Sequence, residues 1–185
     1  MASRKIDLDD ILEITATIVD AGGRTALSIG RLATDLGVQP SALYNHVDGI
    51  DGLWHDFAVH ATDRLADILV EAAVGRSGGS ALRAVGRAYR EFASRHPGQF
   101  ASCVLPPSSA EDALNASHQR IVTVFSRVVA GFDVEPDQHI HVTRTVRAAI
   151  HGFVSLESID GLPSPDDTDP SFEALLDYLV TGLGE

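Results

Sequence analysis

The chain has 185 residues, of which 44% are hydrophobic, so it is long and apolar enough for one large or two small domains. A single cysteine excludes an internal disulfide and favours a reduced, cytoplasmic setting. The sequence has no continuous apolar run of about 18 residues and turns acidic before its first apolar stretch, so we expect neither a membrane span nor a signal peptide. The formal net charge of −12 argues against a broad basic surface.

Helical periodicity begins at residue 7 and continues to residue 21. Asp7, Asp9 and Asp10 favour a helix N-terminus because carboxylates complement the positive end of the helix dipole. Apolar residues then recur three and four positions apart, which is the spacing of one face of an α-helix. Gly22 and Gly23 end this first helix.

Residues 28–54 indicate two short helices across a tight turn, followed at once by a third helix. Ser28 suits the N-cap of the first short helix. Gly37 suits the left-handed residue that closes it, and Pro40 suits the first turn of the next helix, where its missing N–H costs nothing. Two short helices with outward polar side chains on the second are typical of a helix-turn-helix, whose second helix can enter the major groove of DNA.

The rest of the chain also has helical spacing. Apolar stripes predict further helices over about 48–74, 82–93, 110–132, 140–159 and 172–183, with a short element around 100–104. No strand-like alternation of useful length is present, so we expect an all-α fold of about nine helices. A three-helix bundle with the helix-turn-helix would occupy residues 1–50, and a larger helical domain would occupy residues 51–185.

The acidic charge is unevenly distributed along the chain. Residues 1–47 carry a net charge of −2, and the remainder carries −10. A protein that reads DNA tolerates this distribution if its acidic part points away from the duplex. Few basic side chains near the helix-turn-helix predict weak non-specific binding and a shallow salt dependence.

Residues 6–54 resemble the N-terminal domain of TetR-type transcriptional regulators. The likeness rests on LSIGRLATDLGV, ALYNHV and the helix start DGIDGLW, in that order. The C-terminal half resembles the branch of that family whose ligand-binding and dimerising domain is named after a Trp-His-Gly motif. Its segments are RAYREFASRHPGQF at 87–100, IHGFVSLE at 150–157 and SFEALLDYLVTGL at 171–183. His151 and Gly152 are present, with Ile150 in the place of the tryptophan.

The resemblance implies a homodimeric repressor that leaves a palindromic double-stranded DNA operator when a small-molecule effector binds. Tyr44 and His46 match the family's phosphate-contacting pair, and Ser28 matches another phosphate contact. The other candidates for DNA contact are Gln39, Pro40, Ser41 and Asn45 on the exposed side of the second short helix, and the cations Lys5 and Arg31.

Two alternatives stay open for this surface. Asn45 can pair bidentately with adenine and Gln39 with a base edge or a phosphate, but each is equally compatible with a solvated surface. The family often places a lysine near the start of the next helix, where this chain has Ile50 between Asp48 and Asp51. The second candidate function is therefore a dimer of the same fold with weakened DNA contacts, acting as a ligand- or protein-binding module.

A ligand pocket is expected among inward-facing residues of the C-terminal helices. By periodicity its candidates are Tyr89, Phe92, Phe100, Cys103, His118, Val122, Phe125 and His151. For any one of them, a place in a filled core is the better interpretation. The two histidines favour a ligand because a buried polar group left unpaired costs about 1–3 kcal/mol, although another side chain can also be the partner.

Two further apolar stripes, near 140–159 and at the chain end, predict a four-helix dimer interface formed with their symmetry mates. The candidate interface residues are Val146, Ile150, Phe153, Phe172, Leu176, Leu179 and Leu183. Packing within one protomer is the alternative for the same residues.

We expect no metal site, no cofactor and no enzymatic activity. Eight histidines raise the question of a metal, but His139 and His141 are two positions apart on a helix and point to different sides. Ser126 and His118 lie on one helix at a spacing that does not build a catalytic arrangement, and no Ser-His-Asp set is present.

Overall fold

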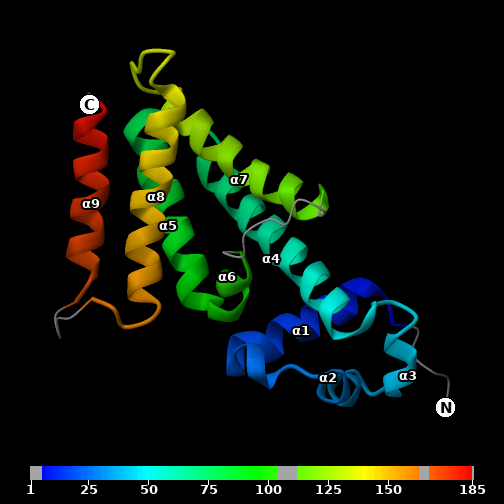
Figure 1. Cartoon of the computed structure of the whole chain (residues 1–185). Coiled ribbons are helices and arrows are strands. Elements are labelled where there is room, and N and C mark those ends of the chain that lie inside the picture. Colours follow the sequence, from blue (N-terminus) through cyan, green and yellow to red (C-terminus); the bar gives the residue numbers. More distant parts are fainter. Residues whose placement is uncertain (1–5, 104–111, 163–166, 185) are drawn as a thin grey trace. The chain divides into compact units, whose positions relative to one another are not determined.

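The computed structural model describes residues 6–103, 112–162 and 167–184 (Figure 1). Over these ranges the regular elements are α-helices and one short 3-10 helix, which confirms the all-α fold and the expected number of helices. They are α1 (Leu8–Gly22), η1 (Arg24–Ala26), α2 (Ile29–Leu36), α3 (Pro40–Leu43), α4 (Gly49–Ala73), α5 (Gly78–Arg95), α6 (Pro97–Cys103), α7 (Asp112–Val129), α8 (His139–Glu157) and α9 (Asp169–Gly182).

The described residues group into two compact units. The first lies within Met1–Asp63 and His96–Asn115, and the second within Arg64–Arg95 and Ala116–Glu185. The first unit thus contains α6 in addition to the helix-turn-helix region. The functional division at residue 50 stays a prediction.

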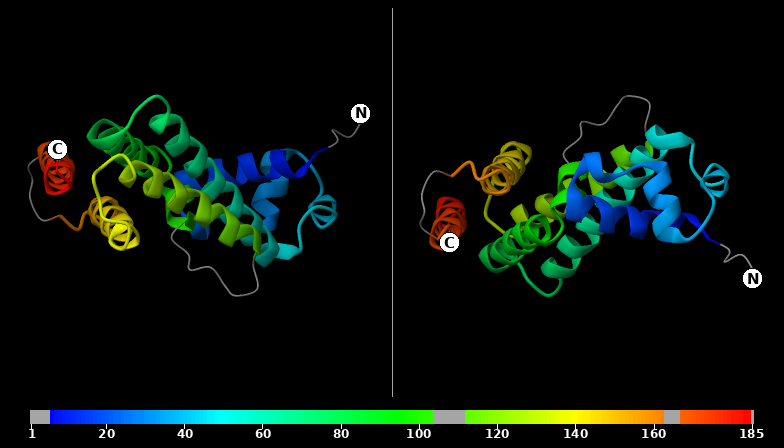
Figure 2. Two further views of the ribbon diagram at one scale, coloured as in Figure 1. Left: turned by 90° about the horizontal axis from the view of Figure 1, so that it is seen from above. Right: turned by 90° about the horizontal axis from the view of Figure 1, so that it is seen from below.

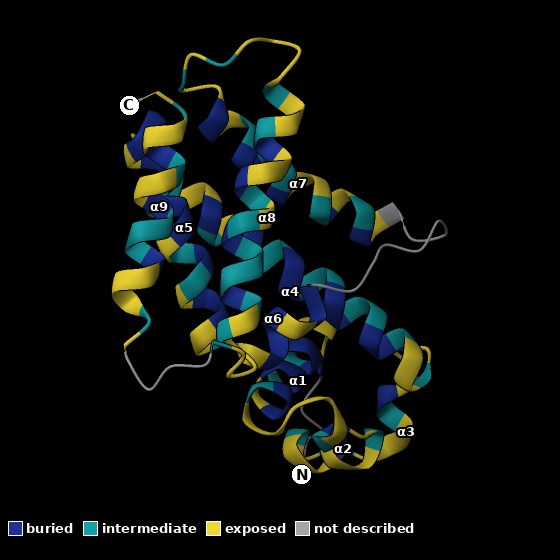
Figure 3. Ribbon diagram, turned by 60° about the vertical axis from the view of Figure 1, so that its left-hand side comes forward, coloured by how far each residue is buried: buried dark blue, intermediate teal, exposed yellow. Residues whose placement is uncertain are grey.

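The first unit is built on the apolar faces of α1, α2 and the start of α4. The side chain of Asp7 accepts a hydrogen bond from the backbone N of Asp10 at 2.9 Å, so α1 begins where its acidic first turn predicts. Ile11, Leu32 and Leu53 are fully buried in a shared apolar core. This core fixes α2 and α3 beside α1 and leaves their polar faces to solvent (Figure 3).

Helix α6 packs on the end of α1 within the same unit. A Cβ on Gly98 would lie 2.4 Å from the carbonyl oxygen of Val19, so only glycine allows the two backbones to approach this closely. The Asp20 carboxylate of α1 accepts hydrogen bonds from the backbone N of Gln99 at 2.9 Å and from its Nε2 at 2.7 Å. The Nδ1 atom of His96 lies 3.1 Å from the same carboxylate.

In the second unit α5, α8 and α9 pack against one another. Helices α8 (yellow to orange) and α9 (red) lie side by side in both views of Figure 2. Gly86 of α5 leaves room for Ile150 and Leu176, because an added Cβ would lie 2.6 Å from the Leu176 side chain. The rings of Phe153 and Phe172 lie 5.2 Å apart.

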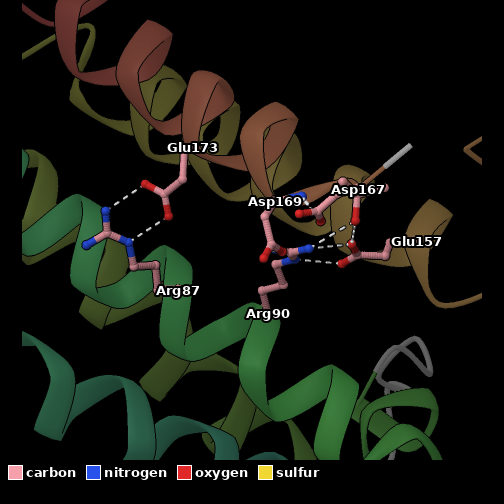
Figure 4. Close-up of polar contacts among 7 residues, drawn as sticks. Arg87, Arg90, Glu157, Asp167, Asp169 and Glu173 are labelled. Carbon is pink, nitrogen blue, oxygen red and sulfur yellow. Dashed lines mark hydrogen bonds and ion pairs between the residues drawn. The ribbon is translucent and has the colours of Figure 1, made fainter. Parts of the chain in front are cut away.

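Ion pairs fasten the outer side of the same three helices (Figure 4). Arg87 binds both carboxylate oxygens of Glu173, at 2.8 and 2.6 Å. Arg90 binds both oxygens of Glu157, at 2.8 and 2.7 Å, and reaches Asp169 with a third nitrogen at 2.7 Å. Arg90 thereby links α5 to both α8 and the first turn of α9.

Candidate nucleic-acid interface

Helix α2 has the start and the stop that its sequence predicts. The Ser28 hydroxyl accepts a hydrogen bond from the backbone N of Arg31 at 3.1 Å and caps the helix. Gly37 ends it in the left-handed conformation with a φ of 69°. The backbone N of Val38 then donates to the carbonyl of Ala33 at 3.0 Å, which closes the turn toward α3.

The second short helix is shorter than expected. Pro40 occupies the first turn, but regular helix ends at Leu43, and residues 44–46 form a turn. The backbone N of Val47 still donates to the carbonyl of Leu43 at 3.0 Å, so the chain continues to coil. Leu43 and Val47 are buried and anchor the segment on the core. Asn45 therefore lies in a turn after α3, where its low helix propensity fits better.

The predicted DNA-contacting side chains are exposed wherever the structure describes them. Tyr44 is 60% exposed, which is more than expected for an aromatic side chain that packs in a protein core. The other exposed candidates are Ser28, Arg31, Gln39, Pro40, Ser41, Asn45 and His46. They come from α2 and α3, which pack on each other, from the N-cap of each helix and from the turn after α3. Lys5 lies outside the described residues.

The local electrostatics reduce the positive charge of this surface. The Nε atom of Arg31 donates to Asp35 at 2.7 Å, one turn further along α2. Asp48 and Asp51 are exposed beside the partly exposed Ile50 at the start of α4. The described part of the surface therefore offers neutral hydrogen-bond donors rather than free cations.

A second group of predicted residues meets in the other unit. The Tyr89 hydroxyl lies 2.9 Å from Nδ1 of His151, and the Ser155 hydroxyl lies 3.2 Å from its Nε2. The ring of Phe125 contacts Tyr89 edge-on with centroids 6.2 Å apart. Burial, and next the positive charge of Arg147, lower the pKa of His151, so its imidazole is neutral at pH 7.

The remaining ligand-pocket candidates are divided between the two units. In the second unit Phe92 is buried, whereas His118 and Val122 are half-buried. Phe100 and Cys103 belong to α6 of the first unit and are both buried. Burial raises the pKa of the Cys103 thiol to about 12, which disfavours the reactive thiolate form.

The candidate dimer residues differ in how deeply they are buried. Val146, Ile150, Phe172 and Leu176 are at most 1% exposed within a single protomer. Their side chains fill the space between α5, α8 and α9. The apolar stripes that suggested a dimer interface therefore pack within one protomer. Phe153, Leu179 and Leu183 are half-buried and keep some surface.

Sequence reasoning missed several polar partners. Ser155, Asp20 and the acidic partners of Arg90 were not singled out, because each contact joins residues that pattern alone does not bring together. Among the described residues, no group of three or more His, Cys, Asp or Glu side chains is arranged to hold a metal. Over the same ranges, no helix combines the length and the apolar character needed to cross a membrane.

Known proteins include relatives of this chain. Residues 82–179 match the family described as "Tetracyclin repressor-like, C-terminal domain". The chain is 28% identical to the Mycobacterium tuberculosis protein named "Uncharacterized HTH-type transcriptional regulator Rv0681", over 97% of this chain and 82% of that one.

Two solved structures show the same fold. A protein of unknown function from Rhodococcus sp. RHA1 superposes over 100% of both chains with a TM-score of 0.80 and 22% identity. The protein BioQ, solved with its natural double-stranded DNA operator, superposes over 96% of this chain and 99% of its own with a TM-score of 0.65 and 21% identity.

Proposed function

The chain belongs to the tetracycline-repressor-like family, and on that premise we propose that it is a dimeric DNA-binding transcriptional regulator, a repressor that a small molecule releases from a palindromic operator. Membership confirms the family expected from the residues, and the narrower branch named after Trp-His-Gly stays a prediction. A regulator of this kind acts where the genome is, so we also propose a cytoplasmic location.

The observation that carries the proposal is the exposed helix-turn-helix surface of α2 and α3. Its side chains are anchored from below by Leu43 and Val47, so their positions are fixed although α3 is short. BioQ has the same fold and was solved on an operator, and the mycobacterial relative is named as an HTH-type regulator. In the proposed mechanism, two such surfaces of a dimer lie about one helical turn of DNA apart.

The test of DNA reading is a selection of binding sites from random duplex DNA with the purified chain. We expect enrichment of a palindrome at low salt. No enriched palindrome would rule out the repressor proposal, since specific binding to a two-fold operator is its central claim.

Variants then distinguish side chains that contact phosphate, and so position the protein, from side chains that contact bases. Tyr44→Phe removes one hydroxyl and is expected to weaken binding about tenfold on all sequences alike, as loss of a phosphate contact does. Asn45→Ala is expected to relax base preference at one position of each half-site. Ser80→Ala, which removes one exposed hydroxyl from α5 of the second unit, is the control and should leave affinity unchanged.

The effector is proposed to bind in the second unit beside the Tyr89–His151 pair. This pair supplies a neutral imidazole and a phenol next to the aromatic ring of Phe125. A ligand that binds more tightly to a state with a different separation of the recognition elements shifts the population away from DNA. Tyr89→Phe is expected to change the effector concentration needed for release without changing the selected DNA site.

The dimer is proposed to form through the outer faces of α8 and α9. Because the inward stripe is already buried, the contact falls to exposed apolar side chains such as Ile140, Leu156 and Tyr178. Sedimentation equilibrium is expected to give a dimer, and Leu156→Glu is expected to raise the monomer fraction. Gln119→Glu, which adds one acidic charge at an exposed position of α7, is the control.

The second candidate function is a ligand- or protein-binding module of the same fold with weakened DNA contacts. The ion pair of Arg31 with Asp35 and the apolar Ile50 favour it, because both reduce attraction to phosphate. A dimer that enriches no DNA sequence but binds small molecules in the second unit would support this candidate.

A further inference from the structure

The first unit contains a pocket of about 270 Å³ that the proposed function does not use. The end of α1, η1, the start of α4 and helix α6 line it, and all lining residues belong to this one unit. We propose that this pocket binds a small aromatic carboxylate, with Arg24 as the anchoring group and Trp54 as the platform beneath it. Its volume is slightly below the ~300–1,000 Å³ typical of drug-sized ligands, which fits a compound with one aromatic ring.

The Trp54 ring supports the guanidinium of Arg24, the group proposed to bind the carboxylate. Its guanidinium carbon is 4.2 Å from the centroid of the Trp54 ring. Contact of the guanidinium carbon with the ring leaves N–H groups of Arg24 available to bind an anion. Trp54 is only 9% exposed and contacts Phe57 edge-on at 5.8 Å, so the platform is fixed. Within the described residues, Arg24 forms no ion pair.

The other polar groups of the pocket are already engaged. Both oxygens of the Asp20 carboxylate accept hydrogen bonds from Gln99, and His96 lies against one of them. The Ser102 hydroxyl donates to the carbonyl of Gly98 at 3.0 Å. Arg24 is therefore the lining group whose charged donors are uncommitted, and a carboxylate is the partner that these donors favour.

The rest of the wall is apolar and selects a flat ring. Val19, Pro97 and Ala101 contribute aliphatic surface to the same pocket. A ring packed on this aliphatic surface buries apolar area while its carboxylate reaches Arg24. Neither interaction requires DNA or a second protomer, so the inference stands apart from the proposed function.

The decisive probe is benzoate, followed through the indole N–H resonance of Trp54, which is the only tryptophan of the chain. In ¹H–¹⁵N spectra of the full chain, benzoate is expected to shift this resonance saturably. Benzamide has the same ring without the charge and is expected to need about tenfold higher concentration. The absence of a saturable shift, or equal binding of the two compounds, would overturn the proposal.

Three variants locate the binding. Arg24→Gln is expected to weaken benzoate binding about tenfold, because the charge-assisted hydrogen bonds are lost. Arg31→Gln, the same change at an exposed arginine of α2 outside the pocket, should leave the affinity unchanged. Ala101→Met fills the pocket and should abolish the shift with Arg24 intact, which decides the matter if Arg24→Gln does not fold. Wild-type affinity in a folded Arg24→Gln variant contradicts the assignment.

Discussion

At Gly98 the backbones of α6 and α1 meet with no side chain between them. An added methyl would lie 2.4 Å from a carbonyl oxygen of α1, and a backbone atom cannot rotate away. Gly98→Ala is therefore expected to lower the free energy of unfolding by about 1–3 kcal/mol in urea denaturation. Gly30→Ala in α2, where nothing lies within 4 Å, is the control and should raise it by about 0.5–1 kcal/mol. Equal effects would contradict the close approach.

The protonation of a single side chain, His151, makes the stability of the fold depend on pH. Burial, with Arg147 as the smaller cause, lowers its pKa below the ordinary value of 6.5. The unfolded chain then binds the proton more readily, so stability is highest above pH 6.5 and decreases as the pH falls from 6.5 toward the folded pKa. An NMR titration is expected to place the midpoint of His151 below 6.5. A midpoint at or above that value would show that the ring is not desolvated.

The roles of single residues can be predicted from the sequence where the chemistry is local. Ser28, Gly37 and Pro40 act through their own backbone, so their roles as cap, stop and first-turn residue can be predicted from position alone. The partners of His151 could not be predicted equally well. Tyr89 lies 62 positions away in the chain, and only packing decides that it is the partner.

At the level of elements, the charged contacts of α5 hold α8 and α9 in place. Arg90 is the most buried of the arginines that do so, with a side-chain exposure of 20%. Its hydrogen bonds lower the pKa of Glu157, which is partly buried as well. Arg90→Gln leaves this carboxylate without its main partner and is expected to cost about 2–3 kcal/mol of unfolding free energy, measured by urea denaturation.

Arg95→Gln is the matched control for Arg90. Arg95 pairs with Glu91 one turn away on the exposed side of α5, so its loss is expected to cost less than about 0.5 kcal/mol. Adding Glu157→Gln to Arg90→Gln should recover part of the loss, because the unpaired carboxylate is removed as well. Similar costs for both single variants would mean that the α5–α8–α9 contacts depend on apolar packing alone.

Helix boundaries show where prediction from pattern ends. The long stripes of α4 and α8 fix those helices to within a few residues, since many apolar positions agree on one period. The segment after Leu43 has too few apolar residues to define a period, and its last turns were predicted as helix but form a turn. The α8 and α9 stripes predicted buried faces correctly, but periodicity cannot distinguish packing within a chain from packing between chains.

For the whole molecule, charge determines how strongly DNA binding depends on salt. With a net charge of −12 and Arg31 paired to Asp35, a dimer is expected to release few counterions, giving a slope of about −2 to −4 in a plot of log K against log salt concentration. Asp35→Asn frees Arg31 and is expected to steepen the slope by about 2 per dimer. Glu91→Gln removes the same charge on α5 and should leave the slope unchanged. No difference between the variants would exclude Arg31 as a phosphate contact.

The overall class was predictable from the sequence, but the grouping of helices was not. Hydrophobic periods and the absence of strand alternation are sufficient for an all-α fold. The position of α6 is not encoded in its own pattern, because Gly98 and Asp20 bring it to α1 through contacts between distant residues. For the same reason Phe100 and Cys103, predicted together with Tyr89, belong to the first unit.

The first unit combines two separate stretches of the chain, and the ribosome makes these stretches at different times. Asp20 meets Gln99 across 79 positions of the chain, so the ribosome synthesises α1 to α4 before their partner α6 exists. During that interval the end of α1 has no cover, and its aspartate has only water for a partner. The helix-turn-helix unit is completed only after α5 has been made, so a nascent chain arrested before residue 97 carries the recognition surface without its final support.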